Sequence, residues 1–204
     1  MEDIVTQIEI NNPNYFVECY CDTNDNSILD PLELQFLDWE YSNSDEMYFL
    51  KGLNLTFGSQ FIDSIPSSIQ NVQSLINLRI IHSSISTIPM EIFSLQNLEI
   101  LDLSQNTLTS LPDFFIELDE SIRIINFSEN DLVELPASIF QLENVELINV
   151  NNNLISSLPE DVCTLGDETV FSISQNSLCN RDFVPNCFEE EVSFQTNCYS
   201  VLDI

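Results

Sequence analysis

The chain has 204 residues, of which 34 are Asp or Glu and only four are Lys or Arg, so its formal net charge is −30 at pH 7. A field of that sign repels nucleic acid and anionic membrane surfaces, and no apolar run approaches the ~18 residues of a membrane-spanning helix. Hydrophobic residues make up 44% of the chain, which suffices for an ordinary core, and the length suits a single domain.

Two short strands are expected near the N-terminus. Alternating apolar residues predict one over Ile4–Ile10, and aromatic and apolar residues predict another over Tyr15–Cys21. Met1 is followed directly by Glu2 and Asp3, which provide neither the basic region nor the apolar run of a signal peptide. This start fits either a cytosolic protein or a mature secreted chain with an added initiator Met.

Residues 22–33 resemble a calcium-binding loop of the EF-hand type. They match the pattern D-x-[DN]-x-[DN]-G-x5-E at five of its six fixed positions. Such a loop can supply the oxygen ligands that calcium prefers. The expected ligands are the side chains of Asp22, Asn24, Asn26 and Glu33, the carbonyl oxygen of Ile28, and a water molecule held by Asp30.

Ser27 departs from this pattern, because the loop normally has a glycine at that sharp turn. Strain there predicts a weak site, with a dissociation constant of ~0.1–1 mM as in extracellular modules. The competing interpretation is a plain helix start, with Asp30 as N-cap, Pro31 as first helical residue and Glu33 as capping-box acid. A short helix is expected over Pro31–Leu37, and residues 40–46 are expected to form a solvated loop before the first repeat strand.

From residue 53 onward the chain repeats one pattern every 23 or 24 residues. Leu98–Pro112, Ile122–Pro136 and Val145–Pro159 each follow L-x-x-L-x-L-x-x-N-x-L, and five prolines mark five copies. A sixth copy begins at Phe171. Each copy should contribute a short strand, such as Leu101–Leu103, and a return segment of ~10 residues that carries the proline near its start.

This pattern resembles the leucine-rich repeat family, which implies an α/β solenoid: a horseshoe with a parallel sheet on its concave side. An Asn at the turn after each strand would bond backbone groups that the turn leaves unpaired. The positions concerned are Asn106, Asn130, Asn153 and Asn176, with Gln60 and Ser83 in the first two copies.

Apolar residues of the return segments should fill the layer behind the sheet, because no single repeat can bury its apolar side alone. They are Ile92, Phe93, Leu95, Phe115, Ile116, Leu118, Ile139, Phe140, Leu142, Val162, Cys163 and Leu165. We therefore assign residues 1–52 to an N-terminal cap, residues 53–178 to about six repeats, and residues 179–204 to a C-terminal cap.

Four cysteines surround the last repeat, namely Cys163, Cys179, Cys187 and Cys198. Their sequence context resembles the C-terminal cap of secreted bacterial leucine-rich repeat proteins, which implies two disulfides that cover the open end of the core. The sequence leaves the pairing open. Cys19 and Cys21 lie at the opposite end, where they can form a tight bridge, stay free or pair between molecules. This placement favours an extracellular or cell-surface protein.

No catalytic constellation is evident in the sequence. His82 is the only histidine and has no cysteine nearby, so a zinc site is not expected. The three glycines are too few for a phosphate-binding loop. Paired carboxylates of the glycosidase kind remain open in so acidic a chain, but a repeat surface offers no deep cleft for them. We therefore do not expect an enzyme.

The concave sheet surface differs in charge from the rest of the chain. Among its outward-facing strand residues only Asp102 and Glu129 are acidic, whereas most other acids fall on the return side or the edges. One repeating position is apolar, and such rows often mark interaction surfaces, unless the adjoining loops cover them. The expected contact residues are Arg79, Ile81, Ile100, Asp102, Ile124, Asn126, Leu147, Asn149 and Val170.

The sequence thus predicts a secreted or cell-surface recognition or adhesion module, stabilised by calcium, that binds a protein or a glycan through its concave face. One alternative is an acidic structural component of an extracellular matrix or surface layer that self-associates through divalent cations. The other is an intracellular scaffold, because the return pattern L-P-x-x-[IF]-x-x-L also resembles intracellular leucine-rich repeats. Neither nucleic-acid binding nor membrane insertion is expected.

Overall fold

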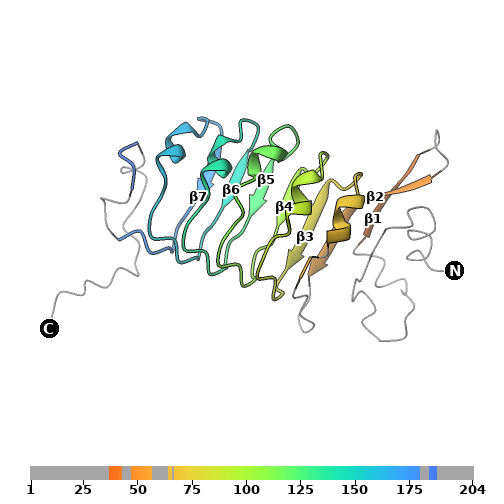
Figure 1. Ribbon diagram of the computed structural model, residues 1–204, viewed down its shortest axis with the longest axis horizontal. Helices are drawn as coiled ribbons and strands as arrows, with labels where there is room; N and C mark the ends of the chain where they lie inside the picture. Colours follow the sequence, from red (N-terminus) through yellow and green to blue (C-terminus); the bar gives the residue numbers. More distant parts are fainter. Residues whose placement is uncertain (1–36, 43–46, 57–63, 66, 180–183, 188–204) are drawn as a thin grey trace.

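The computed structural model of the chain describes residues 37–42, 47–56, 64–65, 67–179 and 184–187. Within these residues seven strands form one sheet, in the order of the sequence (Figure 1). The predicted strands Ile4–Ile10 and Tyr15–Cys21 and the calcium-type loop at residues 22–33 lie outside the described residues.

The sheet begins with an antiparallel pair, β1 (Leu37–Ser42) and β2 (Met47–Thr56). The expected solvated loop over residues 40–46 is therefore wrong in its first half, because residues 40–42 belong to β1. The sequence alternates apolar and polar residues through β1, and β2 supplies the backbone partners that make this alternation a strand. Leu37 likewise begins β1, where the end of a helix was expected.

Strand β2 belongs to both parts of the sheet, because its other edge pairs in parallel with β3. The predicted boundary between residues 52 and 53 therefore falls inside one strand. The remaining strands each pair in parallel with the next and keep equivalent residues side by side. They are β3 (Asn77–Ile81), β4 (Ile100–Asp102), β5 (Ile124–Asn126), β6 (Leu147–Asn149) and β7 (Val170–Ser172).

The return segments carry single turns of 3-10 helix, not α-helices. These are η2 (Ser67–Asn71), η3 (Met90–Ser94), η4 (Phe115–Leu118), η5 (Ala137–Gln141) and η6 (Glu160–Thr164). Pro89, Pro136 and Pro159 hold extended backbone immediately before their turns, and the few residues that follow close i→i+3 bonds, as short turns do. The alternation of strand and helical turn confirms the predicted solenoid.

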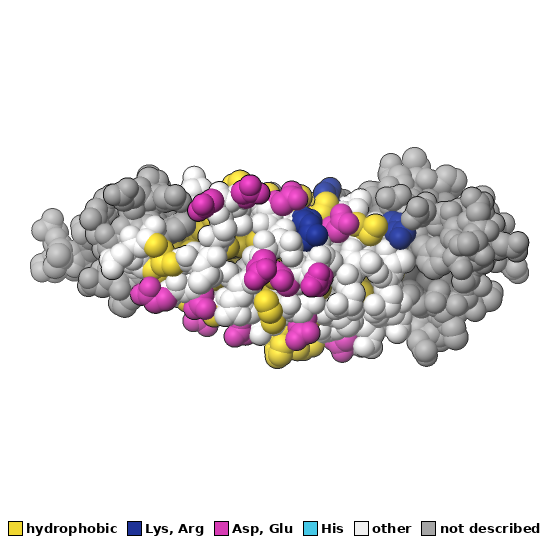
Figure 2. Space-filling model, turned by 90° about the horizontal axis from the view of Figure 1, so that it is seen from above, with side chains coloured by type: hydrophobic (Ala, Val, Ile, Leu, Met, Phe, Trp, Pro, Cys, Tyr) yellow, Lys and Arg dark blue, Asp and Glu magenta, His cyan; other side chains and the backbone are white. Residues whose placement is uncertain are grey.

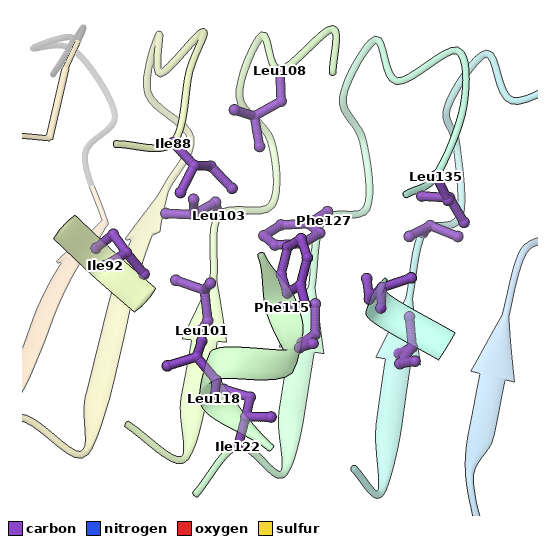
Figure 3. Close-up of a cluster of buried hydrophobic side chains, with 14 of the residues drawn as sticks. Ile88, Ile92, Leu101, Leu103, Leu108, Phe115, Leu118, Ile122, Phe127 and Leu135 are labelled. Carbon is purple, nitrogen blue, oxygen red and sulfur yellow. The ribbon is translucent and has the colours of Figure 1, made fainter. Parts of the chain in front are cut away.

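The core lies between the sheet and the 3-10 turns and runs the length of the repeats. Strands β4, β5 and β6 contribute their central residues and β3 contributes Leu78 and Ile80. Each turn adds one or two residues, and aromatic rings link neighbouring repeats. The centroid of the Phe115 ring lies 5.2 Å from that of Phe93 and 6.0 Å from that of Phe127. Figure 3 shows Phe115 and Phe127 among the buried side chains of the core. Because each repeat packs only on its neighbours, the core is a continuous layer and not a central cluster.

Two residues expected in this layer are exposed: Ile116, at 44% of its surface, and Cys163. Ile116 occupies the position of Phe93 and Phe140, which are buried in the adjacent repeats. Its repeat is one residue longer, because 24 residues separate Pro112 from Pro136 where 23 separate the preceding prolines.

The extra residue lies in the turn after η4. The Ile122 N–H donates to the Leu118 carbonyl four residues back at 2.9 Å, whereas Leu98 donates to Leu95, only three residues back. The turn η4 also begins three residues after its proline, whereas η3 begins directly after Pro89. The repeat therefore keeps Phe115 inside while Ile116 faces solvent. Among the described helices, none has the length and apolar content to cross a membrane.

Candidate interaction surface

A row of buried asparagines at the turns after the strands, here called the asparagine ladder, fixes one edge of the sheet that carries the candidate surface. The Asn130 Oδ1 accepts the Leu108 N–H of the preceding repeat at 2.9 Å, and its Nδ2 donates to the Leu103 carbonyl at 2.9 Å. The same amide group donates to the Phe127 and Ser128 carbonyls of its own repeat. Asn106, Asn153 and Asn176 make equivalent bonds, as predicted.

Directly before each ladder position the backbone adopts the left-handed conformation. Five non-glycine residues have φ between 55° and 57°, and they are His82, Gln105, Glu129, Asn152 and Gln175. This conformation costs a non-glycine residue roughly 1–3 kcal/mol, so its recurrence at one place, including before Ser83, indicates that the repeat geometry as a whole enforces it. Their exposed side chains form a further row, in which Gln105 approaches the His82 Nδ1 at 3.3 Å and donates to Glu129 at 3.1 Å.

The candidate surface, here called the sheet face, consists of the strand residues that alternate with the core. Parallel register arranges these residues in two rows that run across the strands. The apolar row contains Ile100, Ile124, Leu147 and Val170, and the polar row contains Arg79, Asp102, Asn126, Asn149 and Ser172. The structure thus brings all nine predicted contact residues, Ile81 included, onto strands β3–β7.

The apolar row is partly accessible along its length. Ile100, Ile124 and Leu147 are half-buried, and Val170 exposes 57% of its surface. Neighbouring members of the row lie one strand apart, roughly 4.8 Å, so their side chains cover one another on both sides while their outer surfaces stay open. The row therefore presents a narrow apolar band flanked by polar residues.

The polar row is organised by short side-chain bonds to the residue two places on. The Asp102 Oδ1 accepts the Ser104 N–H at 3.0 Å and its hydroxyl at 2.7 Å, and Asn126 accepts the same pair from Ser128. These bonds hold Ser104 and Ser128 in buried positions, although alternation along the strand would turn both outward. They also fix the amide of Asn126 with its oxygen turned to the protein, so its Nδ2 is available to a partner.

Two polar atoms at the N-terminal end of the sheet face are buried without partners. Among the described residues, the Nε of Arg79 and the Oδ1 of Asn54 have no hydrogen bond, although the two residues are paired in register. A buried polar atom of this kind is costly unless a partner supplies the missing bond. Arg79 therefore brings one unsatisfied buried donor, its Nε, to the polar row.

Acidic residues are sparse on the sheet face: Asp102 is the only one within strands β3–β7, and the other described acids beyond residue 76 belong to the connecting and return segments. Figure 2 shows them along both long edges and over the middle of one face, with Lys and Arg at only a few places. On the return side, the hydroxyl and the backbone N–H of Ser138 both donate to Asp113 and hold the pKa of that carboxyl below its usual value.

The described residues contain no group of three or more His, Cys, Asp or Glu side chains that could hold a metal ion. The proposed calcium ligands all lie outside these residues. In the C-terminal cap, Cys163 and Cys187 form a disulfide with a Cα–Cα distance of 5.8 Å, which selects one pairing from those the sequence allowed. Cys179 is also disulfide-bonded, while Cys19, Cys21 and Cys198 lie outside the described residues.

The sequence interpretation missed the exposed apolar residues of the return side. Met90, Phe114 and Ile116 expose 47%, 44% and 44% of their surfaces. One signal could have found Phe114: it stands where the other copies have the polar residues Glu91, Ser138 and Asp161. Ile116 gave no such signal, because its position is apolar in the preceding and following copies.

Comparison with known proteins rests on structure. No protein-family model matches the chain, and no curated protein matches it in sequence. A leucine-rich repeat protein of Leptospira interrogans is 26% identical with a TM-score of 0.58, and the match covers 68% of this chain and 34% of that one. The chain therefore spans about a third of the length of the Leptospira protein.

Two plant structures are similar over more of their length. The leucine-rich repeat ectodomain of the receptor kinase SOBIR1 from Arabidopsis thaliana is 25% identical with a TM-score of 0.58, covering 74% of this chain and 80% of that one. The BIR3–SERK2 complex, also from Arabidopsis thaliana, matches at 21% identity and a TM-score of 0.57, covering 85% and 88%. These likenesses, together with the six parallel strands, show a leucine-rich repeat fold.

Proposed function

We propose that the chain is a non-catalytic binding module that holds a protein partner against its sheet face. The observation that carries this proposal is the accessible apolar row, Ile100 to Val170, on a face that keeps few acids in a chain of net charge −30. Likeness to a receptor ectodomain supports a protein-binding role. The fold itself supplies stacked side chains and no deep cleft, which suits recognition better than catalysis.

The two rows would divide the work of binding. The apolar row offers area that a partner removes from water, at roughly 25 cal/mol per Å². The polar row offers directional groups beside it, namely the Asn126 and Asn149 amides and the Arg79 guanidinium, and these would set the register of the partner. Because the rows lie on strands held by the asparagine ladder, little ordering cost is expected on binding.

The experiment compares two double variants against partners selected on the wild-type protein from a display library of secreted protein domains. Ile124→Asp with Leu147→Asp places carboxylates in the middle of the apolar row, and we expect at least a tenfold loss of affinity. Val133→Asp with Leu154→Asp is the matched control, because both residues are exposed hydrophobics outside the sheet face. Equal loss in both variants, or no loss in either, contradicts the proposal.

A glycan is the second candidate ligand, favoured by the amide-rich end of the sheet face. Asn149, Asn151 and Asn152 lie there within one repeat, and Asn149 donates no bond through its Nδ2 among the described residues. Sugars are recognised largely through such fixed donors and acceptors. A glycan array would favour this candidate if binding survives Ile124→Asp but is lost on Asn149→Asp.

We also propose an extracellular location and calcium binding at residues 22–33. The Cys163–Cys187 disulfide supports the location, because disulfides persist in oxidising compartments. Calcium rests on the loop pattern alone, and a thermal melt tests it: excess calcium should raise Tm relative to chelator, and Glu33→Gln should abolish the difference. Equal melting temperatures of the wild-type protein in calcium and chelator would remove the assignment.

A further inference from the structure

We propose that the return side carries a second docking surface, which takes a peptide segment bearing apolar side chains flanked by Lys or Arg. The surface, here called the η3–η4 patch, consists of Met90, Phe114 and Ile116 on adjacent turns of the solenoid. It lies outside the sheet face and does not depend on the function proposed for that face.

The first observation is that the patch departs from the repeat. At the place of Phe114 the other copies have the polar residues Glu91, Ser138 and Asp161, of which Ser138 is buried, so an exposed aromatic ring stands where the repeat otherwise has a polar side chain. Ile116 stands where Phe93 and Phe140 are buried, and yet exposes 44% of its surface. Neither Phe114 nor Ile116 is needed to pack the core, because Phe115 and Leu118 already fill the layer in this repeat.

The second observation is that the ring of Phe114 and the two turns that carry the patch are held in place by contacts. The ring of Phe114 lies 6.3 Å from the buried ring of Phe93, which in turn contacts Phe115 at 5.2 Å. The two turns are joined by the Gln96 side chain, whose Nε2 approaches the Phe93 and Glu117 carbonyls. Apolar anchors held in this way lose little freedom on binding, which is typical of residues that dominate an interface.

The acidic residues around the η3–η4 patch indicate which kind of peptide would bind there. Between Arg79 and Arg123 the chain contains seven acidic residues and no Lys or Arg. Three of the acids adjoin the patch in sequence: Glu91 follows Met90, Asp113 precedes Phe114, and Glu117 follows Ile116.

Asp113 remains ionised to lower pH than an isolated aspartate, because the Ser138 hydroxyl and N–H donate to it and lower its pKa. A partner with only apolar side chains would have to desolvate these carboxylates without compensation. A second copy of this chain would bring further acids against them. A peptide with Lys or Arg beside apolar side chains can contact both the apolar residues and the carboxylates of the surface. Its positive charge also attracts it to the acidic chain at long range.

The experiment uses three fluorescent peptides of about twelve residues, measured by anisotropy against the full chain. One alternates Leu and Phe with Lys, one has Glu in place of Lys, and one has Ser in place of the apolar residues. We expect binding of the first alone, weakened as NaCl is raised. The double variant Phe114→Ser with Ile116→Ser should weaken it about tenfold, whereas Val133→Ser with Leu154→Ser, equally exposed elsewhere, should leave it within about twofold.

Circular dichroism and Tm establish that each variant is folded. If the serine variant is not, Glu91→Lys with Glu117→Lys reverses the charges beside the patch and should weaken binding of the lysine peptide to a similar degree. Ile124→Asp should leave the peptide affinity unchanged, which separates this proposal from the function of the sheet face.

Several outcomes overturn the proposal. If the lysine–serine peptide binds as tightly as the lysine–apolar peptide, binding is due to general attraction to a charged chain and not to apolar docking. Equal loss in the Val133/Leu154 control places the contact elsewhere, and absence of binding to the first peptide removes it altogether. A wild-type dimer in light scattering that Phe114→Ser dissociates would assign the patch to a second copy of the chain instead.

Discussion

Two buried serines, Ser138 and Ser83, have opposite effects on the stability of the fold. Ser138 accepts the Phe115 N–H through its hydroxyl at 3.1 Å and donates to Asp113, so it links two repeats. Ser83 occupies the ladder position of its repeat, and its hydroxyl is buried without a partner among the described residues. The same side chain therefore stabilises one repeat and leaves a desolvated oxygen in another.

This contrast predicts the outcome of a matched pair of substitutions. Ser138→Ala leaves the Phe115 N–H unsatisfied and should lower the free energy of unfolding by about 1–3 kcal/mol, whereas Ser83→Ala should be neutral or stabilise by up to about 1 kcal/mol. Urea unfolding followed by circular dichroism measures both. A loss of similar size in the two variants would mean that the Ser83 hydroxyl is bonded in solution.

Asp113 makes the stability of the same contact depend on pH. Its pKa in the fold lies below the ordinary value of 3.8, so the ionised carboxylate stabilises the fold above that value and the contribution is lost as pH falls through the folded-state pKa. Asp113→Asn should cost less than ~1 kcal/mol at pH 7, because the group is largely exposed, and the difference from wild type should shrink below pH 4. Unfolding at several pH values tests this, and a difference that grows on acidification contradicts it.

At the scale of single residues, a role that recurs from repeat to repeat could be predicted from the sequence. The ladder asparagines recur at a fixed place, and a buried amide at a turn has few roles other than bonding the backbone. The burial of Ser104 and Ser128 was not predictable from alternation alone. Alternation assigns them to the open face, but their hydroxyls turn back to Asp102 and Asn126, a local bond that competes with exposure.

At the scale of elements, the C-terminal cap is closed by a covalent link. The disulfide between Cys163, in the return segment of the last full repeat, and Cys187 spans a sequence separation of 24 residues. Closing a loop of that size in the unfolded chain is worth about 3 kcal/mol. The bond thus stabilises the end of the core, where only one neighbouring repeat is available for packing.

Replacing both cysteines by serine should lower the free energy of unfolding by about 3 kcal/mol. Hydrogen exchange should locate the loss, with amides of β7 exchanging faster relative to those of β4. A uniform acceleration over all strands would mean that the cap stabilises the whole chain as a single cooperative unit.

Elements were predictable where the repeat specifies them and not elsewhere. Strands β3–β7 and the returns follow from spacing, because each strand and its turn must present apolar residues to the same layer. The hairpin of β1 and β2 was missed at residues 40–42, since a strand at the end of a solenoid depends on a partner outside the pattern. The exposure of Ile116 in η4 was missed because one inserted residue changes the pitch of a turn without changing its apolar residues.

The apolar row of the sheet face was predicted as a pattern, and parallel register places it on one surface. Its degree of exposure did not follow from the sequence. Exposure depends on how far neighbouring side chains cover one another, and Val170 exposes 57% of its surface whereas Ile124 is half-buried.

At the scale of the whole molecule, charge repulsion works against the compact state. With 34 acidic residues and four basic ones, folding brings like charges together along the edges. Screening should relieve this repulsion, so raising NaCl from low to physiological concentration should raise the free energy of unfolding by about 1 kcal/mol, or Tm by ~2–4 °C at this size. Thermal melts in NaCl measure it.

Magnesium and calcium at equal ionic strength serve as controls in the same melts. Equal effects of the two ions would indicate general screening of the carboxylates, and a larger effect of calcium would indicate a specific site. A Tm that falls with salt would contradict the view that repulsion among the acids limits stability.

The asparagine ladder has a consequence for how such a protein can change in length. Each ladder asparagine bonds to its own repeat and to the repeat before it. A tandem duplication in the gene that copied residues 124–146 once would supply the new unit with a rung on either side, and both ends could stay as they are. The length of the solenoid can therefore change in evolution by one repeat at a time. The disulfide-linked C-terminal cap and the antiparallel strands β1 and β2 would be kept unchanged in such a step.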